Sequence, residues 1–177
     1  IYRKILKTQI IAITGSCGKT TLKEMLGSIL KKISKTSYSQ KSFNNKYGVP
    51  LSLFGLKQND DFGVLEVGMD KKGEIDLLTQ IIKPDIGIIT NISYAHSKNF
   101  DSIKGIASAK AEIIENIRPN GTIILNGDDQ FFKFHKKIAL KRKLKVLSFG
   151  INNKSLSTKL VKVEKLNNKF KFFIKLE

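Results

Sequence analysis

Cysteine is almost absent from this sequence of 177 residues, where Cys17 is the single example. An internal disulfide is therefore excluded, and the composition is compatible with a reducing compartment. Long apolar runs are also missing, because no stretch approaches the roughly 20 residues that a membrane-spanning helix needs. The first residues do not show a charged and then apolar leader with a small-residue cleavage site. We therefore expect a cytoplasmic globular protein without a membrane span.

Acidic residues are scarce, with 15 Asp and Glu against 32 Lys and Arg, which gives a formal net charge of +17. Most of the excess lies in residues 133–177, where fourteen basic residues stand against Glu164 and Glu177. So basic a segment is able to bind nucleic acid or anionic lipid, and the phenylalanines among the lysines are able to stack on bases. A lysine-rich solvated surface explains the same composition, and the alternation in residues 169–176 is typical of a half-buried strand. We favour that surface over a nucleic-acid partner.

Short apolar runs alternate with stretches of helical spacing, without an internal repeat or a low-complexity linker. Runs of this length between polar, glycine or proline residues are typical of buried parallel strands. The alternation predicts an α/β fold whose mostly parallel sheet is flanked by helices. An Asn-Asn turn near the end predicts an antiparallel C-terminal hairpin. The expected strands lie within residues 10–14, 61–69, 85–90, 119–129, 145–151, 160–166 and 169–176, and the expected helices at 20–33, at 103–117 and after residue 129.

The first expected strand leads into the turn Gly-Ser-Cys-Gly-Lys-Thr-Thr and then into a helix. This order is typical of a phosphate-binding loop, because glycines allow close backbone approach and a helix N-terminus points N–H groups at an anion. Lys19 supplies positive charge, and the Thr20 hydroxyl is a suitable Mg²⁺ ligand. The longer P-loop pattern would need a glycine at position 13, which is Ile13 in this sequence. Only the shorter Gly-x-x-Gly-Lys-Thr form is therefore present. The turn predicts a P-loop mononucleotide-binding domain with nucleotide contacts from Gly15, Ser16, Cys17, Gly18, Lys19, Thr20 and Thr21.

Four further stretches, together with this loop, resemble the central ATP-binding domain of the Mur ligase family. They are SFNNKYGVPLSLF (42–54), LEVGMDKKGEIDLL (65–78), residues 84–114 with NISYAH, and LNGDD (125–129). The resemblance implies an ATP-driven amide ligation, in which a substrate carboxylate takes the γ-phosphoryl group and an amine then displaces phosphate. Within the family, the patterns are most similar to ligases that add D-Ala-D-Ala to UDP-MurNAc-tripeptide for peptidoglycan. The implied cofactors are ATP and Mg²⁺.

The resemblance also implies roles for individual residues around the phosphates. Lys19 matches the lysine of the phosphate cradle, and Thr20 and Glu66 match the ligands of a first Mg²⁺. Asn45, with Asn44 beside it, matches an asparagine close to the reacting phosphates. Simpler explanations exist, because Glu66 could end a strand at the surface and the asparagines could form an ordinary turn.

Two more residues match a second metal site of the family, and with Lys19 they complete the implied catalytic set. His96 matches the histidine near that metal. Lys110 matches a lysine that CO₂ carbamylates, which converts the cation into a carboxylate able to support Mg²⁺. That chemistry needs a neutral amine, so partial burial or nearby cations must lower the pKa of the lysine. The alternative is an exposed helical lysine that pairs with Glu112 or Glu115.

Three remaining polar residues invite simpler interpretations. Asp128 and Asp129 resemble metal ligands but are equally suited to cap the following helix. His135 lies among lysines of an expected helix, so we expect it at the surface. Cys17 occupies a variable position of the loop, where a small side chain is a more natural interpretation than a nucleophile without a base beside it.

The chain begins at Ile1 and reaches its phosphate-binding strand within about ten residues, as a piece of a longer protein would. We expect residues 1–177 to form a single domain, a fragment of the Mur ligase central domain. The resemblance implies an N-terminal UDP-sugar domain and a C-terminal domain outside it, so the fragment alone should not ligate. The alternatives are another Mur-type or folate-type ligase, an unrelated P-loop NTPase, or a nucleic-acid-binding module.

Overall fold

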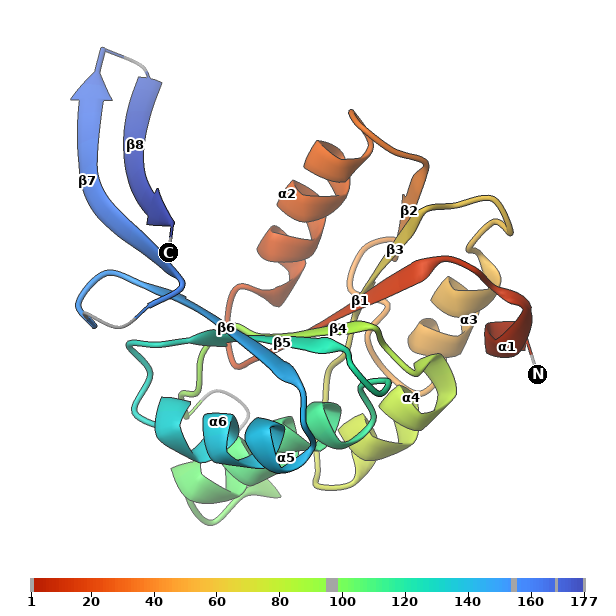
Figure 1. Ribbon diagram of the computed structural model, residues 1–177. Helices are drawn as coiled ribbons and strands as arrows, with labels where there is room; N and C mark the ends of the chain where they lie inside the picture. The colour runs from red at the N-terminus through yellow and green to blue at the C-terminus, as the bar shows by residue number, and fades with distance from the viewer. Residues whose placement is uncertain (1, 95–98, 154–155, 168, 177) are drawn as a thin grey trace.

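The computed structural model describes residues 2–94, 99–153, 156–167 and 169–176, and its strands form one sheet (Figure 1). The order across the sheet is β2-β3-β1-β4-β5-β6-β7-β8, with parallel neighbours from β2 to β7 and an antiparallel pair at β7 and β8. The strands are β1 (Gln9–Thr14), β2 (Thr36–Tyr38), β3 (Phe62–Glu66), β4 (Ile86–Ile89), β5 (Thr122–Asn126), β6 (Lys145–Gly150), β7 (Thr158–Leu166) and β8 (Lys169–Leu176). The helices are α1 (Tyr2–Ile5), α2 (Lys19–Leu30), α3 (Gly48–Phe54), α4 (Glu74–Ile82), α5 (Ile103–Glu115) and α6 (Phe132–Lys141).

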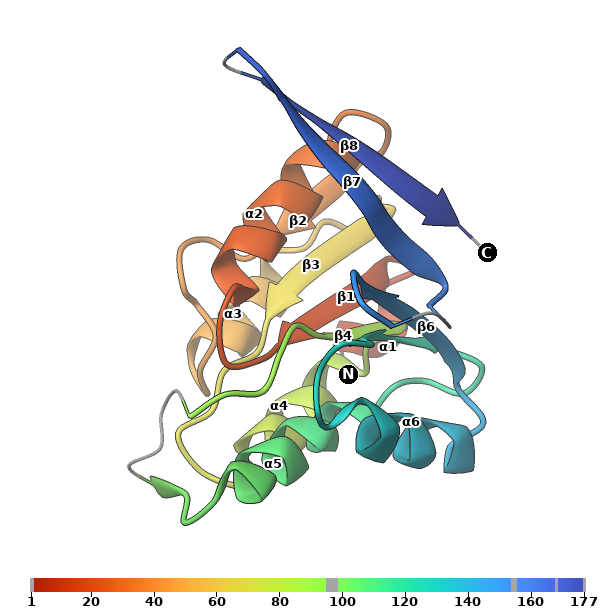
Figure 2. The same cartoon turned by 90° about the vertical axis from the view of Figure 1, so that its left-hand side faces the viewer.

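Helices cover the two faces of the sheet unequally (Figures 1 and 2). Helix α2 covers one face, where Leu22 and Leu26 pack on Ile11 and Ile13 of β1. Helices α3 to α6 lie on the other face and contribute to the larger core. Because β1 and β3 are buried from both sides, their residues read as continuous apolar runs.

Strand β1 lies at the point where the strand order reverses. It pairs with β3 on one side and with β4 on the other, although β4 follows β3 in the chain. In open α/β sheets the crevice at the carboxyl ends of such strands is the usual place for a ligand. The phosphate-loop sequence begins at that end of β1, directly after Thr14.

The expected strands and helices are confirmed in type and order, with ends that differ by a few residues. The helix expected at 20–33 is α2, and the helix expected at 103–117 is α5. Helices α1, α3 and α4 and the short strand β2 were not expected from the sequence. The antiparallel C-terminal pair is confirmed, although Asn168 of its turn lies outside the described residues.

The prediction that residues 169–176 form a half-buried strand is wrong in its burial. Phe170, Phe172 and Ile174 of β8 are each 59% exposed. Strands β7 and β8 project from the body of the molecule (Figure 1), so no described helix packs on the apolar face of the hairpin. Alternation of apolar and charged residues reports that a strand is amphipathic, and the burial of its apolar face depends on what covers it.

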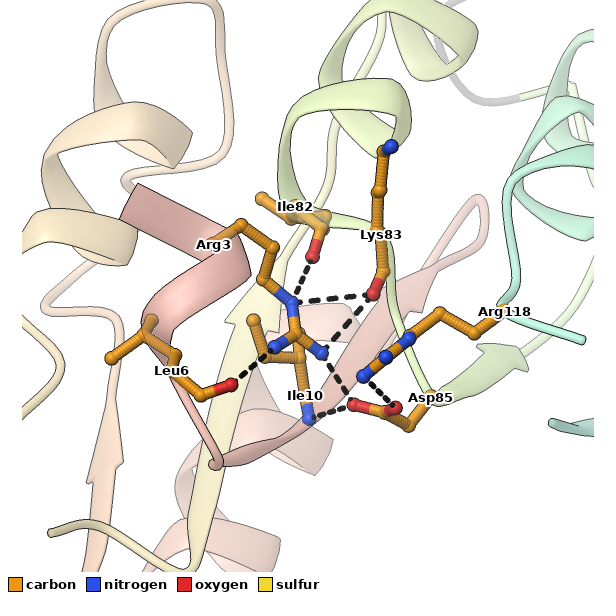
Figure 3. A network of polar contacts seen from close by, with 7 residues as sticks. All are labelled: Arg3, Leu6, Ile10, Ile82, Lys83, Asp85 and Arg118. Atoms are coloured by element: carbon orange, nitrogen blue, oxygen red, sulfur yellow. Dashed lines mark hydrogen bonds and ion pairs between the residues drawn. The ribbon is translucent and has the colours of Figure 1, made fainter. Parts of the chain in front are cut away.

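The buried side chain of Arg3 holds the amino end of β1 in place through hydrogen bonds and an ion pair (Figure 3). Its Nε donates to the Ile82 carbonyl at 2.8 Å, and its Nη2 lies 2.7 Å from Asp85 Oδ2. The same carboxylate accepts the Ile10 N–H and a hydrogen bond from Arg118. Burial lowers the pKa of Arg3, while the charge of Asp85 raises it. The network joins α1 and the end of α4 to the starts of β1 and β4.

His135 does not lie at the surface, and that prediction is wrong. The residue is 2% exposed, and its Nε2 lies 3.0 Å from the Ala107 carbonyl of α5. Burial lowers the pKa of the imidazole. The neighbouring Lys136 is exposed, whereas His135 shares the inner face of α6 with Ala139, four residues on.

Within the described ranges, none of the helices has the length and apolarity needed to cross a membrane.

Candidate nucleotide and metal site

The turn between β1 and α2 has the backbone that its glycines allow. Gly15 has φ 145°, and a Cβ there would lie 1.8 Å from Thr90 Oγ1, so a larger residue would collide with the segment after β4. Gly18 has φ 80° and directly precedes α2. Both conformations are strained for residues with a side chain. The turn therefore brings its backbone to the start of α2, as a phosphate-binding loop requires.

Residues that follow β4 hold the loop in this shape. The Ser16 N–H donates to the Asn91 carbonyl, and the Cys17 N–H donates to Asn91 Oδ1, both at 2.9 Å. Thr90 Oγ1 donates to the Cys17 carbonyl at 2.7 Å, and Ser16 Oγ donates to the Ser93 carbonyl at 3.0 Å. Thr90 and Asn91 were not among the residues expected from the sequence, although two polar residues directly after a buried parallel strand are a signal for this edge of the sheet.

Two lysine ammonium groups meet at one backbone carbonyl of the loop. Lys19 Nζ donates to the Gly15 carbonyl at 2.9 Å, and Lys110 Nζ from α5 donates to the same oxygen at 3.0 Å. Lys110 is 2% exposed. Burial lowers the pKa of Lys110 to about 8, and the positive charge of Lys19 acts in the same direction. Two cations so close together create an electrostatic field that favours a bound anion.

The alternative interpretation of Lys110 as an exposed helical lysine is wrong. The side chain crosses from α5 to the phosphate loop instead of pairing along its own helix. Glu112 accepts the N–H groups of Gly73 and Asp76, at 2.8 and 3.0 Å, and so holds the start of α4. Partial burial or nearby cations were expected to lower the pKa of this lysine, and the structure has both.

Glu66 is buried at the carboxyl end of β3 and is held by two side chains. It is 1% exposed, and its Oε2 accepts the Thr20 hydroxyl at 2.8 Å. Its Oε1 accepts the Asn44 amide at 2.7 Å. The interpretation of Glu66 as a surface strand end is therefore wrong, and the structure brings together Thr20 and Glu66 as the sequence analysis expected.

The two adjacent asparagines point to different partners. Asn44 reaches Glu66, whereas Asn45 Oδ1 accepts the N–H groups of Tyr47 and Gly48 at 3.1 and 2.9 Å and so holds the start of α3. Both still line one cavity of about 390 Å³ beside the phosphate loop. Its walls include Lys19, Asn44, Asn45, Lys46, Tyr47, Gly68, Met69, Asp70, Glu74, Leu77, Leu78 and Lys110.

The donor atoms at Glu66 suit Mg²⁺ bound together with phosphate. A carboxylate and a hydroxyl are hard oxygen ligands, and Mg²⁺ is usually held by one or two carboxylates plus substrate phosphates and water. Within the described ranges, His, Cys, Asp and Glu do not gather in groups of three or more that could hold a metal without such a ligand. Thr20 and Glu66 therefore fit a metal that arrives with a nucleotide.

The remaining residues that the sequence offered for the site are His96, Asp128, Asp129, Thr21 and Cys17. His96 lies outside the described residues, so its role stays a prediction. Asp128 accepts three backbone N–H groups from residues 151–153, chiefly that of Ile151, and these lower its pKa. Asp129 accepts the N–H groups of Ile92 and Phe131. Both carboxylates thus order loops, and Asp129 does so just before α6. Thr21 is exposed on the first turn of α2, and Cys17 is exposed in the loop.

The family model of the Mur ligase middle domain matches residues 13–177 of the chain. The chain is 44% identical to the UDP-N-acetylmuramoyl-tripeptide–D-alanyl-D-alanine ligase of Buchnera aphidicola subsp. Acyrthosiphon pisum, over 88% of the chain and 34% of that protein. The Bacillus subtilis enzyme of the same name is 41% identical over 72% of the chain and 28% of its own length. The chain thus spans about a third of the length of these curated relatives.

Solved structures agree with this family match. MurF from Acinetobacter baumannii superimposes with a TM-score of 0.90 at 34% identity, over 99% of this chain and 38% of that one. MurF from Thermotoga maritima in complex with ADP superimposes with a TM-score of 0.87 at 25% identity, over 99% of this chain and 40% of that one. The α/β architecture with a C-terminal antiparallel pair is therefore the architecture of these proteins.

Proposed function

Because the chain belongs to the Mur ligase family, we propose that it forms the ATP-binding part of a ligase that joins D-Ala-D-Ala to UDP-MurNAc-tripeptide. The proposal covers the whole-protein activity, its peptidoglycan precursors and its cytoplasmic location. The observation that carries it is that two features of a nucleotide site lie side by side at the carboxyl edge of the sheet. A loop with two lysines at its Gly15 carbonyl lies beside a carboxylate held by Thr20.

In this proposal each side chain has a positioning or electrostatic role in phosphoryl transfer. Lys19 and the N–H groups at the start of α2 bind the phosphates of ATP. Thr20 and Glu66 would hold a Mg²⁺, and the bound ion would neutralise charge on the phosphates. Asn45 lines the cavity in which the carboxylate substrate would meet the γ-phosphoryl group. The amine of D-Ala-D-Ala then displaces phosphate from the acyl phosphate.

We propose further that Lys110 acts as a carbamate in the full-length enzyme. Its neutral amine would attack CO₂ through the Nζ lone pair and release one proton, leaving a carboxylate on Nζ. The pKa of about 8 supports this step, since a substantial fraction of the amine is neutral near that pH. Together with His96, this carboxylate would support a second Mg²⁺.

The experiment is a ligation assay of the full-length polypeptide with UDP-MurNAc-tripeptide, D-Ala-D-Ala and MgATP. We expect amide formation to depend on all three, with one phosphate released per bond. The 177-residue chain alone should not ligate, because the relatives are about three times as long. Turnover with a single D-amino acid or with glutamate in place of the dipeptide would contradict the substrate assignment.

A matched pair of variants tests the role of Lys110. Lys110→Arg keeps a positive charge but cannot form this carbamate, so it should abolish most ligation while sparing the fold. The matched control is Lys104→Arg, which changes an exposed lysine of the same helix and should leave turnover unchanged. Near-normal turnover of a folded Lys110→Arg enzyme at limiting bicarbonate would contradict the carbamate.

A further inference from the structure

Lys23 is a fully buried lysine on α2 that the activity described so far does not use. Its exposed fraction is 0%, and it lies three residues after Thr20, on the same side of the helix. Its Nζ donates to the Lys41 carbonyl and forms an ion pair with Glu24 Oε1 at 2.9 Å. The side chain of Glu24 is 48% exposed, whereas that of Lys23 is fully buried. A buried ammonium strongly destabilises a fold unless such partners are present.

The Lys41 carbonyl belongs to the loop that carries Asn44. Lys41 has φ 47°, a left-handed conformation that a residue other than glycine adopts at some cost in free energy. A hydrogen bond to its carbonyl compensates for part of that strain. Three residues later, the Asn44 carbonyl accepts the Gly68 N–H at 2.7 Å, just beyond the end of β3. A Cβ at Gly68 would lie 2.9 Å from the Asn44 amide, so the loop lies tightly against this edge of the sheet.

These contacts connect α2, the loop and the Glu66 carboxylate through a series of hydrogen bonds. Glu66 accepts hydrogen bonds from the Thr20 hydroxyl and from the Asn44 amide. From Asn44 the loop leads back to Lys41, whose carbonyl is held by Lys23 on the same helix as Thr20. Each contact fixes the geometry of the next, and the two hydrogen bonds at Glu66 orient both of its oxygens.

We propose that Lys23 is a positioning residue, which holds the Lys41 carbonyl so that Asn44 orients the Glu66 carboxylate toward the Mg²⁺ of the nucleotide. The inference rests on the proposed function, in which Glu66 is a metal ligand. Groups that orient a metal ligand commonly change metal affinity by about tenfold or more when they are removed. A lysine whose only role is to fill the core would instead affect stability without changing the metal dependence.

The test is the Mg²⁺ dependence of ATP binding in the full-length polypeptide, measured by titration calorimetry at a series of Mg²⁺ concentrations. Lys23→Met keeps most of the buried volume but removes the donor. We expect it to raise the Mg²⁺ concentration needed for half-maximal ATP binding by about tenfold. The matched control Lys32→Met changes an exposed lysine just after α2 and should leave this concentration unchanged.

A double variant separates positioning from simple packing. Asn44→Ala alone should raise the Mg²⁺ concentration needed for half-maximal ATP binding by a similar factor, and adding Lys23→Met should raise it little further, because both act through Glu66. Additive effects on the Mg²⁺ dependence, or an unchanged dependence in folded Lys23→Met, would overturn the inference. Lys23→Gln retains an N–H donor and should be milder than Lys23→Met.

Two outcomes distinguish this inference from the proposed function. If the wild-type polypeptide binds ATP without any need for Mg²⁺, the role of Glu66 as a metal ligand fails and the inference falls with it. If the wild type shows the metal dependence and the variants do not alter it, the inference alone fails. If Lys23→Met and Lys23→Gln both fail to fold, Lys23 is needed for the fold and the positioning role is overturned as well.

Discussion

The two ends of β1 differ in whether the charged side chains around them are paired with opposite charges. At the amino end, the Asp85 carboxylate lies between the guanidinium groups of Arg3 and Arg118, so opposite charges are paired (Figure 3). At the carboxyl end, Lys19 and Lys110 donate to the same carbonyl oxygen. In the part of the chain that the structure describes, neither of these lysines has a carboxylate within ion-pair distance.

This difference separates the end of the strand whose charges stabilise the fold from the end at which we propose that the nucleotide binds. A paired charge network that joins α1, α4 and the first residues of β1 contributes to the native state without any ligand. Two close cations without an acidic partner oppose folding, and an anion that binds there removes this repulsion. In the proposed function a bound nucleotide would therefore stabilise the carboxyl end, whereas the chain itself stabilises the amino end.

The largest expected effect is on the carboxyl end, with Lys19→Met. Removing the charge at the phosphates should lower ligation by the full-length enzyme about 10³-fold, the scale seen when one group that stabilises transition-state charge is lost. The unfolding free energy should not fall, because the variant also relieves repulsion with Lys110. Steady-state ligation kinetics and urea unfolding measure the two effects. A folded Lys19→Met enzyme with more than a tenth of wild-type turnover would contradict this role.

The next effect is at the amino end, with Asp85→Ala. The change leaves Arg3 buried without its carboxylate, which should lower the unfolding free energy by about 3 kcal/mol. Urea unfolding measures the loss, and Asp101→Ala, at an exposed aspartate, should change the unfolding free energy little. An Asp85→Ala variant as stable as the wild type would show that the network does not stabilise the fold.

A smaller effect of opposite sign is expected from Lys110→Met. The pKa of Lys110 in the folded state is about 8, below the pKa of 10.5 of an unperturbed lysine. Below pH 8 the amine is protonated in both the folded and the unfolded state, so the folded state includes the full free-energy cost of burying the charge. There the variant should be more stable than the wild type by about 2 kcal/mol, less than the full shift because a hydrogen bond is also lost.

The pH profile gives this prediction its control. Between pH 8 and 10.5 the unfolded wild type binds more protons than the folded wild type, so wild-type stability rises with pH relative to the variant. The advantage of Lys110→Met should therefore shrink across that interval and turn into a small loss of stability above it, where only the missing hydrogen bond still counts. Urea unfolding at pH 7, 9 and 10.5 checks the trend. An advantage that does not depend on pH would show that burial of the charge is not its cause.

Local patterns in the sequence were sufficient for the strands that bound the site and for the phosphate loop. Glu66 was singled out because its own segment, residues 65–78, carries part of the family resemblance. The sequence patterns did not distinguish Lys23 from the other lysines of so basic a chain, because its burial depends on a loop that lies eighteen residues away. His135 was misplaced for the same reason, since its partner is on α5.

The exposed hairpin shows the opposite limit. The pattern of β8 correctly predicted a strand and its antiparallel pairing, because both follow from neighbouring residues. Its burial depends on what packs against it, which a local pattern does not contain. The pairing of Asn44 with Glu66 could not be read from the sequence either, since Asn44 and Asn45 are identical in type and their different directions arise from the start of α3.

The most direct test of the contrast between the two ends is thermal unfolding of the full-length polypeptide with and without saturating MgATP. A ligand that binds only the folded state raises the unfolding midpoint by an amount set by its affinity. We expect MgATP to raise the unfolding midpoints of the wild type and of Asp85→Ala by similar increments, although the variant starts lower. We expect it to change the midpoint of Lys19→Met very little. Equal increments in all three proteins would contradict a nucleotide site at the carboxyl end of β1.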